Sequence, residues 1–121
     1  MTIRVGRLPY VSSEPFYFDM ERRGIELHSM PPSAVSAAAE AGEIDAGPVP
    51  LADCGRLEDR FRPLSGFCIG TKTRAGSVIL HVTRPIEDLA GARIGVTGDA
   101  STALRLLQLL LSLKYQVQPE A

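Results

Sequence analysis

Residues 31–47, PPSAVSAAAEAGEIDAG, constrain the fold more than any other stretch of the chain. Two prolines suit the start of a helix, the alanine-rich middle has a high helix propensity, and Gly42 can adopt the left-handed conformation that ends a helix. Ile44 and Ala46 then alternate with polar residues, which is typical of a strand. A strand that follows a helix this closely predicts an αβ unit with a short connection.

Strand-like and helical segments alternate along the rest of the chain as well. Short β-like segments are expected at Ile3 and Val5, Ile25 and Leu27, Val78–Val82 and Ile94–Val96. After Pro85 the sequence predicts a short helical turn, a turn at Gly91 and a helix from about Ser101 to Lys114. This order predicts an α/β fold with right-handed βαβ units, a mainly parallel sheet and helices on both faces.

The helix expected at 101–114 is apolar on nearly every side. It is shorter than the roughly 20 residues that a bilayer core requires, so a buried helix explains it better than a membrane span. The chain has 121 residues, 45% of them hydrophobic, which is typical of one globular domain. Thirteen basic and fourteen acidic side chains give a net charge of -1, which disfavours binding to nucleic acid.

Cysteine and histidine usage gives little sign of a reactive centre. Cys54 and Cys68 lack a CxxC spacing, and we expect both to be ordinary buried thiols. His28 and His81 lie far apart in strand-like segments and match no metal-ligand spacing, so no metal is expected. The start of the chain shows no secretory signal, which makes the cytoplasm the expected compartment.

Three loops are candidates for ligand binding, because ligands of open α/β sheets lie at the carboxyl ends of the strands. They are Tyr10–Ser13 after the first strand, AGPVPLAD at 46–53, and TGDASTA at 97–103. The simpler alternative is that Ser and Asp residues here cap helices: Ser12, Ser13, Asp99 and Ser101. Lys72 and Arg74 are either a solvated charge pair or a clamp for a carboxylate.

Three blocks of the sequence, nearly end to end, resemble the first half of chorismate dehydratase from the futalosine route to menaquinone. They are RVGRLPYVSSEPFY (4–17), GIELHSMPPSAVSAAAEAGEIDAGPVPLAD (24–53) and GSVILHVTRPIEDLAGARIGVTGDASTALRLLQLLLSLKYQVQPE (76–120). The resemblance implies a fold similar to type II periplasmic binding proteins, with two α/β lobes around a cleft. Residues 1–84 would then form the first part of lobe one, 85–91 the crossover and 92–121 the start of lobe two. Because members of the family are about twice as long, we expect this chain to be a fragment, or to be completed by a homodimer.

The resemblance also implies an activity, the dehydration of chorismate to 3-[(1-carboxyvinyl)oxy]benzoate without metal or organic cofactor. The substrate-binding residues that it implies are Tyr10, Ser12, Ser13, Ser77, Thr97, Ser101 and Thr102, with Ser12 as the catalytic candidate. Ser12 stands where the family usually has Asn, and Pro50, Thr73, Arg74, Ala100 and Ala103 are further departures from its pattern. The resemblance identifies no catalytic base.

Three alternatives follow from these departures. A non-catalytic module of the same fold would hold a small carboxylate without converting it, and the loss of the usual Asn favours this reading. The sister enzyme acting on cyclic dehypoxanthine futalosine ordinarily has Ser-Pro-Cys-Pro-Asn-Asp in this turn, so LPYVSSEP disfavours it. An inactive remnant is the third alternative.

Overall fold

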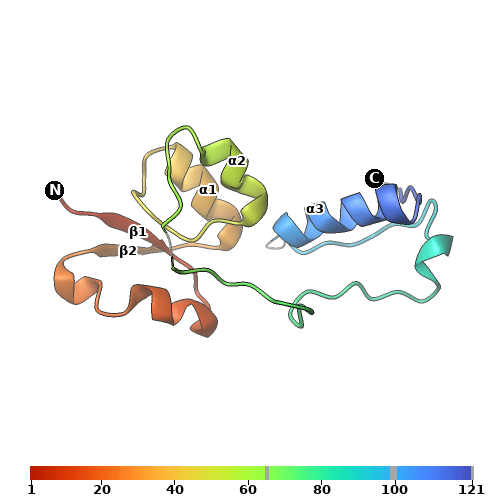
Figure 1. Ribbon diagram of the computed structural model, residues 1–121, viewed down its shortest axis with the longest axis horizontal. Coiled ribbons are helices and arrows are strands. Elements are labelled where there is room, and N and C mark those ends of the chain that lie inside the picture. Colours follow the sequence, from red (N-terminus) through yellow and green to blue (C-terminus); the bar gives the residue numbers. More distant parts are fainter. Residues whose placement is uncertain (65, 99–100, 121) are drawn as a thin grey trace. The chain divides into compact units, whose positions relative to one another are not determined.

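The structure, a computed structural model, describes residues 1–64, 66–98 and 101–120, with the side chain of Ser101 left out. Composition alone favours one core, whereas the chain divides into two compact units, Met1–Gly70 and Thr71–Ala121. The elements of each unit are shown in Figure 1. The lobe boundary implied by the resemblance, at residues 85–91, concerns a complete two-lobed protein and stays a prediction.

The first unit is built on two parallel strands, β1 (Arg4–Arg7) and β2 (Glu26–Ser29). Arg4 pairs with Glu26 and Arg7 with Ser29 at the two ends of the ladder. A parallel bridge joins Val5 on the other side of β1 to Ala46, where the backbone N–H of Gly6 donates to the Ala46 carbonyl at 2.8 Å. The strand predicted at Ile44 and Ala46 is therefore reduced to a single bridge.

Helices cover both sides of this sheet. Figure 1 shows α1 (Pro32–Glu40) and α2 (Cys54–Leu57) on one side of the strands. The 3-10 helices η1 (Val11–Tyr17) and η2 (Glu21–Arg23) lie on the other side. A further 3-10 turn, η3 (Leu51–Asp53), leads into α2. The predicted α/β class, with parallel strands and helices on both sides of the sheet, is confirmed for this two-stranded sheet.

Helix α1 has the start and stop that the sequence predicts. Pro32 occupies the first turn, where the missing N–H is not needed, and Gly42 has a φ of +73°, which ends the helix in the left-handed conformation. The helix buries Val35, Ser36, Ala38 and Ala39. Its apolar face belongs to one core cluster, Leu8, Val35, Ala38, Ala39, Ile44 and Leu57.

Two glycines let α1 approach the sheet closely. A Cβ added at Gly6 would lie 3.0 Å from Cδ1 of Ile44, and one added at Gly47 would lie 3.1 Å from Cγ1 of Val35. Ile44 is 2% exposed and Val35 is fully buried, so neither contact has open space into which to relax. Glycine is therefore a packing requirement within β1 at Gly6 and beside the Ala46 bridge at Gly47.

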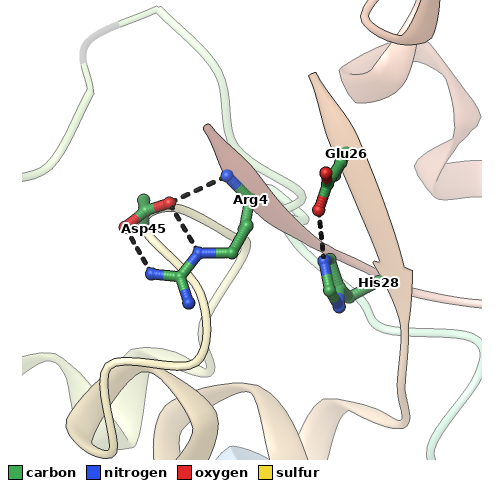
Figure 2. A network of polar contacts seen from close by, with 4 residues as sticks. All are labelled: Arg4, Glu26, His28 and Asp45. Atoms are coloured by element: carbon green, nitrogen blue, oxygen red, sulfur yellow. Dashed lines mark hydrogen bonds and ion pairs between the residues drawn. The ribbon is translucent and has the colours of Figure 1, made fainter. Parts of the chain in front are cut away.

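The Arg4–Asp45 ion pair holds the edge of β1 that faces away from β2. Arg4 donates through Nε and Nη2 to the two carboxylate oxygens of Asp45 at 3.1 and 2.9 Å, and its backbone N–H donates to Oδ2 at 2.8 Å (Figure 2). The side-chain hydrogen bond from Arg4 has the largest effect on the Asp45 carboxyl, and the backbone hydrogen bond from Arg4 the next largest. Together they hold the pKa of Asp45 below its usual value. This pair ties residue 45 to residue 4 and stabilises the bridge at Ala46.

The second unit contains a 3-10 turn η4 (Ile86–Asp88), helix α3 (Ser101–Leu109) and a π-helical turn η5 (Leu110–Lys114). A parallel bridge joins Arg93 to Glu120, so the chain before α3 pairs with the chain after η5. Gly91 has a φ of +69° at the predicted turn. The helical turn after Pro85, the turn at Gly91 and the helix from Ser101 to Lys114 are confirmed. The β-like segment predicted around Ile94–Val96 is reduced to a single bridge at the neighbouring Arg93.

Three predictions from the sequence are wrong. Val78–Val82 is not a strand, because its β-branched residues have no neighbouring strand with which to pair, and Val78, Ile79 and Val82 are exposed. The helix at 101–114 is not buried: Leu111 is covered, but Leu106, Leu109 and Leu113 are more than half exposed. Cys54 and Cys68 are both exposed free thiols. Within the described ranges, none of the helices combines the length and apolarity that a bilayer crossing demands.

Candidate functional site

The first candidate loop is a compact turn between β1 and the helices of the first unit. Tyr10 has an extended backbone (φ -115°, ψ 137°) and precedes the 3-10 helix η1. The backbone N–H of Ser13 donates to the Tyr10 carbonyl at 3.0 Å, which closes the first helical turn. We call residues 8–17 the β1–η1 turn; it carries Tyr10, Ser12 and Ser13 within four consecutive residues.

The three predicted residues of this turn differ sharply in exposure. Tyr10 is 42% exposed and Ser12 is exposed as well, so both residues lie at the surface of the turn. Ser13 is completely buried, and its Oγ has no hydrogen-bond partner among residues 1–64, 66–98 and 101–120. The helix-capping alternative does not describe Ser12 and Ser13, because Tyr10 holds the N-cap position of η1 and both serines lie inside the helix.

Two contacts across the β1–η1 turn hold it closed. Arg7 donates through Nη2 to Oε1 of Glu14 at 2.7 Å, and this hydrogen bond keeps the pKa of Arg7 above its ordinary value. The backbone N–H of Leu8 donates to the Tyr17 hydroxyl at 2.9 Å, inside the protein. Tyr17 is 6% exposed and anchors this turn in the core.

A shallow hollow of about 830 Å³ lies beside η1 and is lined by Val11, Glu14, Pro15, Tyr17, Phe18 and Asp19. None of Tyr10, Ser12 and Ser13 lines it. Its two carboxylates are already ion-paired, Glu14 with Arg7 and Asp19 with the following arginines. We therefore centre the candidate site on the exposed hydroxyl residues of the turn and not on this hollow.

The second candidate loop is stiffened by prolines and held by α1. Gly47 packs under Val35, and Pro50 precedes η3 with an extended backbone. The hydroxyl of Ser36, which is 1% exposed, donates to Oδ2 of Asp53 at 2.7 Å. This partly buried bond fixes the end of the loop and leaves the Asp53 carboxylate engaged in the fold.

The remaining predicted residues belong to the second unit. Ser77 and Thr97 are exposed. Ser101 and Thr102 are the first two residues of α3, where backbone N–H groups at a helix N-terminus favour an anion. Thr102 is half-buried and already engaged in an interaction, while the predicted cap Asp99 lies outside the described residues.

Charged and histidine side chains outside these loops lie at the surface. Lys72 and Arg74 are exposed, as a solvated pair would be. His28 is 44% exposed and lies 3.5 Å from the Glu26 carboxylate on the same strand (Figure 2), and His81 is exposed. In the part of the chain that the structure describes, no three His, Cys, Asp or Glu side chains gather where they could hold a metal ion.

Sequence reasoning missed the contacts that shape the turn. The Leu8–Tyr17 bond and the Arg7–Glu14 pair join residues seven to nine positions apart in a segment with no helical or strand periodicity. The only signal in the sequence was the choice of tyrosine at residue 17, because phenylalanine would fill a core position equally well. A tyrosine hydroxyl in the core usually has a hydrogen-bond partner, and here that partner is a backbone N–H.

A comparison with protein families shows to which family the chain belongs. A family model described as menaquinone biosynthesis matches residues 3–121, so the match takes in the β1–η1 turn, the second loop and the start of α3. It covers nearly the whole chain and agrees with the resemblance read from the sequence. The chain belongs to the menaquinone biosynthesis family.

Proposed function

We propose that this member of the family dehydrates chorismate to 3-[(1-carboxyvinyl)oxy]benzoate. The observation that carries the proposal is the pair of exposed hydroxyl residues, Tyr10 and Ser12, on a turn held closed at both ends, in a chain of the menaquinone biosynthesis family. Hydroxyl donors fixed in place are suited to hold carboxylates, because a preorganised donor needs no rearrangement when the ligand binds.

The reaction removes one water. The C–H bond at the ring carbon that carries the ether breaks, its electron pair becomes part of the aromatic ring, and the neighbouring C–O bond breaks as the hydroxyl leaves. The departing hydroxyl takes a proton and becomes water. In the proposal, Ser12 donates a hydrogen bond to this leaving group, and aromatisation of the ring supplies the driving force.

The second set of ligand contacts comes from the second unit. Ser77 and Thr97 are exposed, and the N-terminus of α3 with Ser101 and Thr102 offers backbone N–H groups to a carboxylate. We propose a fold of the type II periplasmic-binding-protein class, in which a homodimer or a further C-terminal half contributes to the binding site.

The experiment mixes the purified chain with chorismate and follows ultraviolet absorbance, with the product identified by chromatography and mass. Release of the benzoate supports the proposal, and Ser12→Ala is expected to slow it about 100- to 1,000-fold, the range for loss of one preorganised donor. Binding of chorismate without product would instead identify a carboxylate-binding module. Absence of both binding and product contradicts the proposal.

A further inference from the structure

We propose that Tyr17 is the positioning residue of the β1–η1 turn: its hydroxyl fixes the backbone at Leu8 and thereby sets where Tyr10 and Ser12 are presented. Tyr17 itself is buried and touches no ligand in this account. The part of the inference that concerns chorismate binding rests on the proposed function. The part that concerns the backbone of the turn, tested by hydrogen exchange, does not.

The geometry gives the turn a closed base. Leu8 is the first residue after β1 and packs in the core cluster with Val35 and Ile44. Its backbone N–H, beyond the end of the strand ladder, donates to the Tyr17 hydroxyl at 2.9 Å. Leu8 is 8% and Tyr17 6% exposed, so this bond is shielded from water. The residues between them, which include Tyr10 and Ser12, are held as a loop with both ends fixed in the core.

The hydroxyl and the ring of Tyr17 have separate roles. The ring packs in the interior, with its centroid 6.3 Å from that of Phe16, and phenylalanine would preserve this packing. Phenylalanine would also leave the Leu8 N–H buried without an acceptor, and a backbone donor in that position seeks a new partner. The backbone of the turn would then shift at its base, ahead of Tyr10.

The second contact across the turn, the Arg7–Glu14 ion pair, is weaker because it is exposed to solvent. The side chains of Arg7 and Glu14 are 35% and 46% exposed, so salt screens their attraction. The buried bond to Leu8 is insensitive to salt and is therefore the dominant restraint. Glu14→Gln in high salt should accordingly change ligand binding much less than Tyr17→Phe does.

The test compares Tyr17→Phe with Ala37→Gly. Ala37 is exposed in the middle of α1, and glycine there lowers stability through helix propensity alone, by about as much as one lost buried hydrogen bond. Chorismate affinity is measured by calorimetry, and amide hydrogen exchange reports on the turn. We expect Tyr17→Phe to weaken chorismate binding about tenfold and to speed exchange at Ser13, whose N–H bonds to the Tyr10 carbonyl.

Ala37→Gly should lower the unfolding temperature similarly and change neither readout. Unchanged affinity and unchanged exchange in Tyr17→Phe would overturn the inference, as would equal losses in both variants. If the wild-type chain binds no chorismate, the proposed function fails while the exchange comparison still decides the role of Tyr17. The wild-type chain adds a check that needs no variant: the Leu8 amide must exchange slowly, and exchange at the rate of an open amide contradicts the inference.

Discussion

Replacing Ser13 with alanine is expected to make the free protein more stable. Ser13 is completely buried, and its hydroxyl has no hydrogen-bond partner within residues 1–64, 66–98 and 101–120. Most substitutions in a core destabilise a protein, so a gain in stability here would be diagnostic.

The magnitude follows from two opposing effects. A buried hydroxyl without a partner costs about 1–3 kcal/mol, which alanine would relieve. The oxygen leaves a small void, and at about 24 cal/mol per Å³ a void of roughly 20 Å³ returns about 0.5 kcal/mol. The net gain is about 1 kcal/mol, which corresponds to a rise of about 4–8 °C in unfolding temperature for a unit of this size.

Thermal unfolding followed by circular dichroism measures this shift, with Ser12→Ala as the matched control. Ser12 is the exposed neighbour, and its truncation should change stability by no more than about 0.5 kcal/mol. Chorismate binding to both variants is measured in parallel. A fall in unfolding temperature for Ser13→Ala would show that its hydroxyl has a stabilising partner and would refute this reasoning.

Two further predictions concern the packing and charge that support the turn. Because Arg4 lowers the pKa of Asp45, the pair stabilises the fold above the unfolded-state value of 3.8, and this contribution is lost as pH falls through the lower folded-state value. Asp45→Asn should therefore reduce the urea midpoint near neutral pH and leave it close to wild type in strong acid; an equal reduction at both would contradict the assignment. Gly47→Ala should cost about 1–3 kcal/mol in urea unfolding, because its Cβ would lie 3.1 Å from the fully buried Val35; a neutral result would show that α1 can move away.

Local patterns in the sequence predict the elements whose causes are local. The prolines, alanines and Gly42 around α1 determine its start and its end within one segment. Strand β1 is predicted by the alternation at Ile3 and Val5; Val5 is buried in it, whereas Ile3 lies before the strand and is 50% exposed. The candidate turn is predicted from its place after β1, where parallel α/β folds present polar groups.

Features that depend on distant partners could not be predicted this way. Residues Val78–Val82 have the composition of a strand, but a strand forms only beside another strand. The burial of Ser13 and the exposure of Ser12 depend on how η1 winds, and both residues look alike in the sequence. The Arg4–Asp45 pair joins residues 41 positions apart and follows from the fold, not from spacing.

The most direct test of the account is a nuclear magnetic resonance titration of the isotope-labelled chain with chorismate. The account predicts that the amide signals of Tyr10 and Ser12 shift along a saturating curve as chorismate is added. Unchanged signals at both residues would contradict chorismate binding at the β1–η1 turn.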